Sequence, residues 1–296
     1  MYINNLESSQ ASNGDIINVI KNVISYNSEL KNSIIVVKLP NEMLESQALM
    51  TNFADNLKVI TGGGASVVVV HDCPTSTSKY ISSLGINPEY LKKLDSIDKR
   101  ATSVTEMLVA GHVNKSIAAL LCKTGCNAIG LSGKDCNLLD SRSSLVSRRI
   151  NKEVHELEFI SKPVMLNIEF VHDLLHCGMI LVIAPIAFDQ DFITYILDPN
   201  ITAGFVATEL DAKHLVFLTS LGKMKTSEGC LTHCDIQDIK SLYQNGEIDS
   251  RFANIIESVQ QSITSEPQVC YVAESGRKDA LLLTLFSEKY STKIII

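Results

Sequence analysis

Short apolar runs alternate with stretches of helical periodicity along most of the chain. The runs that predict buried strands are rich in β-branched residues and cover residues 34–37, 67–70, 128–131, 179–183, 215–219, 269–272 and 293–296. Apolar positions spaced three and four apart predict helices over residues 16–24, 43–56, 76–83, 103–121, 167–178, 201–210, 235–243, 254–262 and 279–286. This alternation predicts an α/β fold with a parallel or mainly parallel sheet covered on both faces.

Punctuating residues refine this pattern. Ser103 and Glu106 fit a capping box at the start of the clearest helix, and Gly125 fits its end. A hairpin-rich stretch is expected to follow the third strand, up to about residue 162. The glycine run 62–64 lies before the strand predicted over residues 67–70. Ligands bind beyond the carboxyl ends of parallel strands, which is the other end of that strand. We therefore interpret that run as a plain turn and expect the functional residues after the strands.

Composition and charge narrow the class of protein. The 296 residues are 45% hydrophobic and 20% charged, which is ordinary for a soluble globular protein. No apolar run is long enough to span a bilayer, and the polar N-terminus lacks the features of a signal peptide. The net charge of −7, without a basic tract, argues against nucleic-acid binding by phosphate neutralisation. We expect a cytoplasmic protein with no nucleic-acid partner and no membrane contact.

The eight cysteines are scattered, which favours reduced thiols over a disulfide framework. Two local groups could be metal ligands: the first is His172, His176 and Cys177, and the second is Cys230, His233 and Cys234. Neither has an obvious fourth ligand nearby, although zinc sites use four ligands or three and water. We therefore predict no structural metal, and interpret the two groups as core packing and a solvated loop.

Five segments, in order along the chain, carry a family resemblance. EMLVAGHVNK at residues 106–115 is similar to EMVLAGKVNK, and residues 130–135 read GLSGKD. VIAPI at 182–186, LVFLT at 215–219 and ALLLTLF at 280–286 are similar to VISPI, LILLTD and ALLLELF. These are motifs of acetylglutamate kinase, so the chain, from about residue 17 to its end, resembles the amino-acid kinase family.

The resemblance implies a three-layer αβα sandwich of the carbamate kinase type, with an eight-stranded, mainly parallel sheet. It also implies transfer of the ATP γ-phosphoryl group to the side-chain carboxylate of N-acetyl-L-glutamate, with Mg²⁺, in arginine biosynthesis. Residues 1–14 would be a flexible N-terminus. Residues 15–187 would form an N-terminal lobe that holds the acyl-amino acid and the interface of a homodimer, and residues 188–296 a C-terminal lobe that holds the nucleotide.

Several family site positions are retained. Lys38 ends the first predicted strand, where the family has a catalytic lysine that neutralises the transferred phosphoryl group. The alternative is that its side chain only reaches solvent. Asn200 and His71 correspond to substrate-binding positions. The positions that would line the nucleotide pocket are Thr219, Ser220 and Gly222, although Ser220 stands where the family has an aspartate.

Other family site positions carry a different residue type. Family glycines are replaced by Pro40, Asn41, Asp72 and Cys73, an arginine by Asp95, an organising aspartate by Gly204 and a second lysine by Ile255. Proline has no N–H to donate, and each lost charge-stabilising group typically costs about 10²–10³ in rate. Arg251 is the nearest cation to the missing lysine. Three interpretations stay open: a divergent acetylglutamate kinase, a catalytically degenerate binding or regulatory protein, and a kinase for another acceptor.

Overall fold

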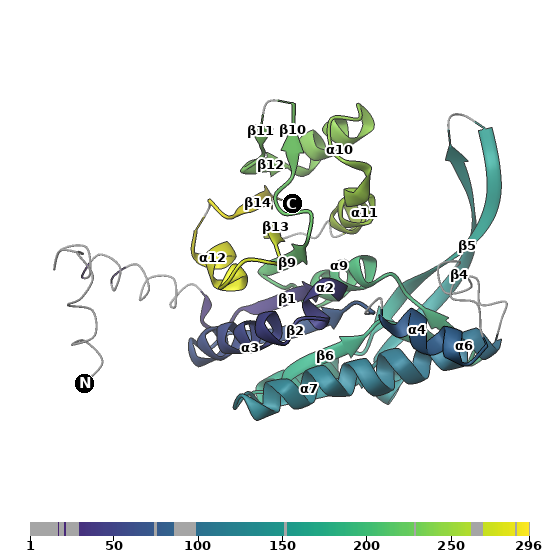
Figure 1. Ribbon diagram of the computed structural model, residues 1–296, viewed down its shortest axis with the longest axis horizontal. Helices are drawn as coiled ribbons and strands as arrows, with labels where there is room; N and C mark the ends of the chain where they lie inside the picture. Colours follow the sequence, from purple (N-terminus) through teal and green to yellow (C-terminus); the bar gives the residue numbers. More distant parts are fainter. Residues whose placement is uncertain are drawn as a thin grey trace.

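The computed structural model describes residues 30–73, 76–85, 99–150, 153–227, 229–261, 269–287 and 289–295, together with Ile17 and Lys21. Its centre is an eight-stranded sheet in the order β12-β14-β13-β9-β1-β2-β6-β3 (Figure 1). These strands are β1 (Ile34–Leu39), β2 (Ser66–His71), β3 (Ala128–Ser132), β6 (Ile180–Ala184), β9 (His214–Thr219), β12 (His233–Asp235), β13 (Val269–Glu274) and β14 (Ser291–Ile295). Only β13 and β14 pair antiparallel among these neighbours. The predicted α/β fold with a mainly parallel sheet is confirmed.

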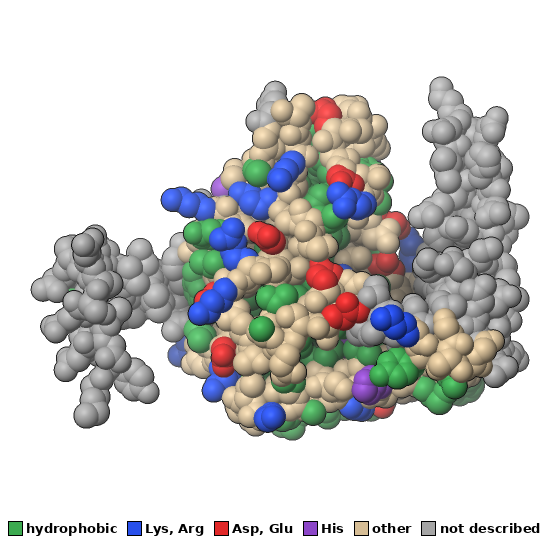
Figure 2. All heavy atoms as spheres, in the orientation of Figure 1, with side chains coloured by type: hydrophobic (Ala, Val, Ile, Leu, Met, Phe, Trp, Pro, Cys, Tyr) green, Lys and Arg blue, Asp and Glu red, His purple; other side chains and the backbone are tan. Residues whose placement is uncertain are grey.

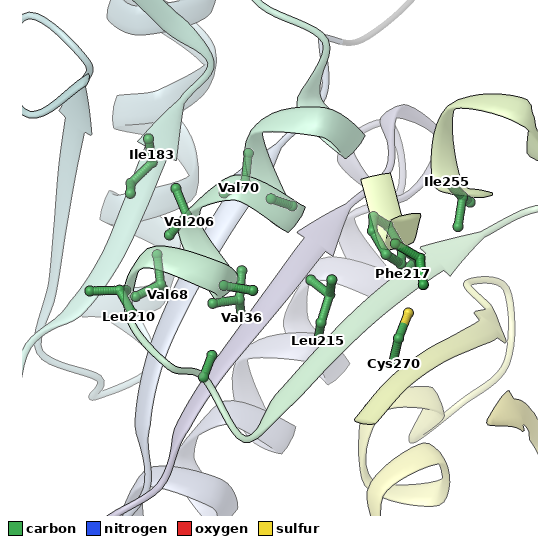
Figure 3. Packing of buried hydrophobic residues seen from close by; sticks show 14 of the residues in the cluster. Val36, Val68, Val70, Ile183, Val206, Leu210, Leu215, Phe217, Ile255 and Cys270 are labelled. Carbon is green, nitrogen blue, oxygen red and sulfur yellow. The ribbon is translucent and has the colours of Figure 1, made fainter. Parts of the chain in front are cut away.

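Alternate side chains of the central strands pack on opposite faces of the sheet. Ile35 and Val37 of β1 pack with α3 (Gln47–Gly62), α7 (Asn114–Lys123) and α12 (Ala280–Phe286). Val36 packs on the other face, in a cluster that Figure 3 shows in part. The helices of that face are α8 (Ile168–His176), α9 (Pro199–Glu209), α10 (Ile236–Gln244) and α11 (Ala253–Gln261). Strands buried on both faces have continuous apolar sequences, which is why they were visible as runs.

Smaller elements lie outside the main sheet. A second sheet has the order β5-β4-β7-β8, and the long β4–β5 hairpin projects away from the body (Figure 1). Its strands are β4 (Leu139–Ile150), β5 (Glu153–Leu166), β7 (Ile186–Phe188) and β8 (Thr194–Ile196). The remaining short elements are α2 (Asn41–Leu44), α4 (Ser76–Ser83), η2 (Asp135–Asn137), β10 (Lys225–Thr226), β11 (Gly229–Cys230) and η3 (Ser250–Phe252). The hairpin was expected; β7 and β8 were missed because three residues are too short for a periodic signal.

Two predicted helices differ from the structure. Helix α6 already spans Lys99–Glu106, so Ser103 lies inside it and the predicted capping box is wrong. It continues through a π-helical segment, η1 (Met107–Val113), into α7. The helix predicted over 43–56 is split, because Ser46 caps α3 by accepting the Leu49 N–H through its hydroxyl (3.4 Å).

Other predictions fall at the limits of the described chain. The N-terminal segment 1–14 and Asp95 lie outside the described residues, and so does most of the helix predicted over 16–24. The glycine run ends α3 and turns into β2 at its amino end, with Gly64 at φ +91°, as expected.

Among the described residues, no helix is both long and apolar enough to cross a membrane. On the face shown in Figure 2, positive and negative side chains are interspersed.

Candidate active site

The carboxyl ends of the central strands meet at one edge of the sheet. Lys38 of β1 lies opposite Val70 of β2 and Phe217 of β9 in the strand register. The residues that follow these strands are therefore close together, namely Asp72 after β2 and the turn after β9. This is the edge where ligands bind in parallel α/β sheets, so the predicted site residues are expected to lie along it.

Lys38 is engaged by a carboxylate of its own chain. Its Nζ lies 3.1 Å from Oδ2 of Asp72. The Lys38 side chain is 8% exposed and that of Asp72 is 31% exposed, so the lysine does not simply reach solvent. An ammonium group this buried needs an anionic partner, and Asp72 supplies it from the position where the resembling family has a glycine.

Asp72 is held in place on several sides. Its backbone N–H donates to the Leu39 carbonyl (2.9 Å) and so extends the β1–β2 ladder. Its Oδ1 accepts the Cys73 N–H (2.8 Å), and its carbonyl oxygen lies 2.7 Å from Nδ1 of His71. The carboxylate is therefore fixed toward Lys38 by the backbone around it.

His71 supports Asp72 from inside the protein. It is fully buried, and this burial lowers the pKa of its imidazole to about 4. Since a carbonyl oxygen only accepts, Nδ1 carries the proton and donates to Asp72. Nε2 then accepts from the Asn114 amide nitrogen (3.1 Å), which also lies near the carbonyl oxygens of Val182 (2.8 Å) and Leu131 (3.2 Å), so its two N–H groups are shared among three acceptors. His71 thus lies behind Asp72, and a direct contact between His71 and a substrate stays a prediction.

The segment after β1 forms a helical turn in place of a glycine loop. Pro40 caps α2, and its carbonyl accepts the Met43 N–H (3.3 Å). Glu42, in the first turn of α2, accepts a hydrogen bond from the hydroxyl of Ser275, which follows β13 (3.0 Å). A second carboxylate is therefore bound at the edge where the family would hold phosphate.

The predicted nucleotide residues form a tight turn after β9. The Gly222 N–H donates to the Thr219 carbonyl (3.3 Å), and Thr219 Oγ1 accepts the Leu221 N–H (3.2 Å). Gly222 has φ +71°, a conformation that favours glycine, and Ser220 is exposed. The Ser275 N–H also donates to the Thr219 carbonyl (3.0 Å). The structure thus brings these residues to the carboxyl edge, and their contact with a nucleotide stays a prediction.

Asn200 lies in the first turn of α9, at the same edge, because α9 runs antiparallel to the strands it covers. The carboxylate of Asp198 caps this helix by accepting the N–H groups of Asn200 (2.8 Å) and Ile201 (3.0 Å). The Asn200 carbonyl accepts the Ser258 hydroxyl (2.7 Å). Asn200 is half-buried, and substrate binding by its side chain stays a prediction.

No cation replaces the family's second lysine at its position in α11. Ile255 is 5% exposed and packs in the apolar cluster with Phe217 and Cys270 (Figure 3). The Arg251 side chain is 69% exposed and lies 2.5 Å from Asp249, which holds it at the surface. Arg251 therefore does not reach inward in this structure.

The best-matching motifs, residues 106–115 and 130–135, contact one another. Glu106 forms an ion pair with Lys134 (2.8 Å), which also donates to Thr194 Oγ1 (2.6 Å). Lys115 Nζ donates to the Gly130 carbonyl on the edge strand β3. Two of the five segments that carry the resemblance therefore contact each other, which the sequence alone does not reveal.

Comparison with known proteins places this arrangement in a family. The model of the amino acid kinase family matches residues 33–229. The chain belongs to the amino acid kinase family. Acetylglutamate kinase from Campylobacter curvus is 29% identical over 271 residues, which are 91% of this chain and 94% of that protein. The enzyme from Bartonella quintana is 28% identical over 284 residues, 94% of each. The resemblance to acetylglutamate kinase is confirmed.

Solved structures share the fold at lower identity. N-acetylglutamate synthase from Neisseria gonorrhoeae, complexed with coenzyme A and N-acetyl-glutamate, has a TM-score of 0.76 at 19% identity. The match covers 95% of this chain and 63% of that one, so this chain spans about two thirds of the synthase. Carbamate kinase from Giardia lamblia bound to AMP-PNP has a TM-score of 0.60 at 11% identity, over 89% of this chain and 98% of that chain.

The donors at the carboxyl edge fit Mg²⁺ and ATP poorly, although the family implies both. Within the described residues, no group of three or more His, Cys, Asp and Glu side chains is arranged to hold a metal ion. The ammonium of Lys38 is already paired with Asp72, and Glu42 adds a second negative charge to this edge. A polyanion would meet negative charge where the resemblance predicts neutralising groups.

Proposed function

We propose that this protein is a divergent acetylglutamate kinase homologue that retains the ligand-binding fold but transfers phosphoryl groups weakly or not at all. It would act chiefly as a binding or regulatory protein, in the cytoplasm. The observation that carries this proposal is the Lys38–Asp72 ion pair, which neutralises the retained catalytic cation. The apolar surroundings of Ile255 support it, because a buried apolar cluster does not favour an ammonium group at this position.

The second candidate is an active acetylglutamate kinase that phosphorylates the side-chain carboxylate of N-acetyl-L-glutamate with ATP and Mg²⁺. The relatives of that name favour it, since they are similar over more than nine tenths of this chain. Lys38 also stands at the expected end of β1. In this candidate a ligand would have to displace Asp72 from Lys38 before transfer.

Both candidates share a proposed organisation. The N-terminal lobe, residues 15–187, would hold the acyl-amino acid and a homodimer interface. The C-terminal lobe, residues 188–296, would hold the nucleotide through Thr219, Ser220 and Gly222. His71 would act by positioning, and Asn200 would contact the acyl-amino acid.

One assay separates the two candidates. Acyl-phosphate formed from N-acetyl-L-glutamate and Mg²⁺·ATP is trapped with hydroxylamine, and the wild type is compared with Lys38→Ala. We expect equal, background signals from both proteins, together with calorimetric binding of N-acetyl-L-glutamate to the wild type. Turnover that Lys38→Ala abolishes would establish the kinase and refute our proposal. Failure to bind either ligand would leave only a role through a protein partner.

A further inference from the structure

Among the described residues, the carboxylate of Asp72 contacts the Lys38 ammonium. We infer that Asp72 is a specificity-determining residue, which occupies the phosphoryl subsite at Lys38 as an internal anion and excludes phosphate groups from it. This rests on the proposed function only in taking the carboxyl edge of the sheet as the place where ATP phosphates would lie. A carboxylate and a phosphoryl group offer an ammonium the same chemistry, namely charged oxygens.

Other contacts of Asp72 hold its carboxylate in the ion pair with Lys38. Asp72 Oδ2 contacts the ammonium at 3.1 Å, while Oδ1 accepts the Cys73 N–H at 2.8 Å. The carboxylate thus uses one oxygen to anchor itself and the other to bind Lys38. His71, fully buried, fixes the Asp72 carbonyl (2.7 Å). Rotating the carboxylate away would break the Cys73 contact and leave Lys38, whose side chain is 8% exposed, without its anion.

Two further donors at this edge are also occupied by carboxylates of the chain. Glu42 accepts the Ser275 hydroxyl (3.0 Å), and Asp198 accepts the first amides of α9. A helix N-terminus and a hydroxyl are groups that commonly bind phosphate oxygens. The subsite therefore suits a ligand that carries no phosphate where it faces Lys38.

Removing the negative charge of Asp72 should allow phosphate groups to bind at Lys38. The probe is inorganic pyrophosphate, titrated calorimetrically into the full-length protein. Asp72→Asn keeps the shape and an acceptor for Cys73 but loses the charge. A negative charge a few ångströms from a bound anion lowers the affinity for that anion by about tenfold or more. We therefore expect Asp72→Asn to bind pyrophosphate at least about tenfold more tightly than the wild type does.

Two controls make the measurement specific. Asp211→Asn removes the same charge at the opposite, amino edge of the sheet, just before β9, and should leave the affinity at the wild-type value. Lys38→Met combined with Asp72→Asn should lose the gain, because the gain depends on the freed ammonium. Asp72→Ser repeats the test if the asparagine variant does not fold.

The possible results of these binding experiments distinguish this inference from the proposed function. Equal or weaker binding by the Asp72 variants overturns the inference, and so does a gain that persists without Lys38. Failure of both Asp72 variants to fold also overturns it, because Asp72 would then be structural. These results are independent of turnover: an inactive wild type with unchanged binding in Asp72→Asn refutes this inference alone, whereas acyl-phosphate formation refutes the proposed function.

Discussion

Burial of His71 should make the folded state sensitive to acid. Its pKa is lowered from the ordinary 6.5 to about 4, chiefly by desolvation in a fully buried position. Above pH 6.5 the imidazole is neutral in both the folded and the unfolded chain. Between pH 6.5 and 4, His71 binds a proton in the unfolded chain but not in the folded chain. The free energy of unfolding therefore falls as the pH is lowered.

The size of this effect follows from the two pKa values. Each pH unit between them contributes about 1.4 kcal/mol, so His71 removes up to about 3 kcal/mol of stability by pH 4. Below pH 4 both states are protonated and this loss stops growing. Such a loss is a large fraction of the roughly 5–15 kcal/mol by which domains are stable. His214 has a similarly lowered pKa, about 4, also through burial, and adds a loss of the same sign.

The assay is urea unfolding followed by circular dichroism at several pH values between 7 and 4.5. His71→Asn keeps a donor for the Asp72 carbonyl but cannot take up a proton, so its stability should fall less steeply than that of the wild type. The same substitution at the exposed His112, His112→Asn, provides the matched control. His214 and the carboxylates titrate in all three proteins, so the difference in slope isolates His71. Equal slopes for wild type and His71→Asn would refute the reasoning.

Three further predictions concern packing and assembly. A Cβ at Gly130 would lie 2.2 Å from Asn114 Oδ1, so Gly130→Ala should lower the free energy of unfolding in urea by about 1–3 kcal/mol. A Cβ at Gly111 would meet nothing within 4 Å, so Gly111→Ala should lower it far less. A double-mutant cycle on Glu106 and Lys134, each about one third exposed, should give a coupling energy of about 0.2–1 kcal/mol, and zero coupling would show that the ion pair does not link the two motifs. Light scattering should give twice the 32.5 kDa chain mass for the proposed homodimer, and a monomer mass would contradict it.

Much of the fold was predictable because its strands are buried on both faces. Runs such as 34–37 and 67–70 are apolar without interruption, and they became β1 and β2. Helix ends were predictable where capping chemistry is local, as at Asp235 before α10 and Gly125 after α7. The start at Ser103 was wrong because capping residues also occur inside helices, and the π-helical segment left no sequence signal.

The sequence by itself determined the alternation of strands and helices, the family resemblance and which site residue types had changed. It did so because periodicity, capping and motif spacing are local properties of the chain. Only the tertiary structure decided what the changed residues do. Asp72 is 34 positions from Lys38, and their ion pair exists because parallel register brings the ends of β1 and β2 together. The contacts of His71 with Asn114, and of Glu106 with Lys134, likewise join segments that only folding makes neighbours.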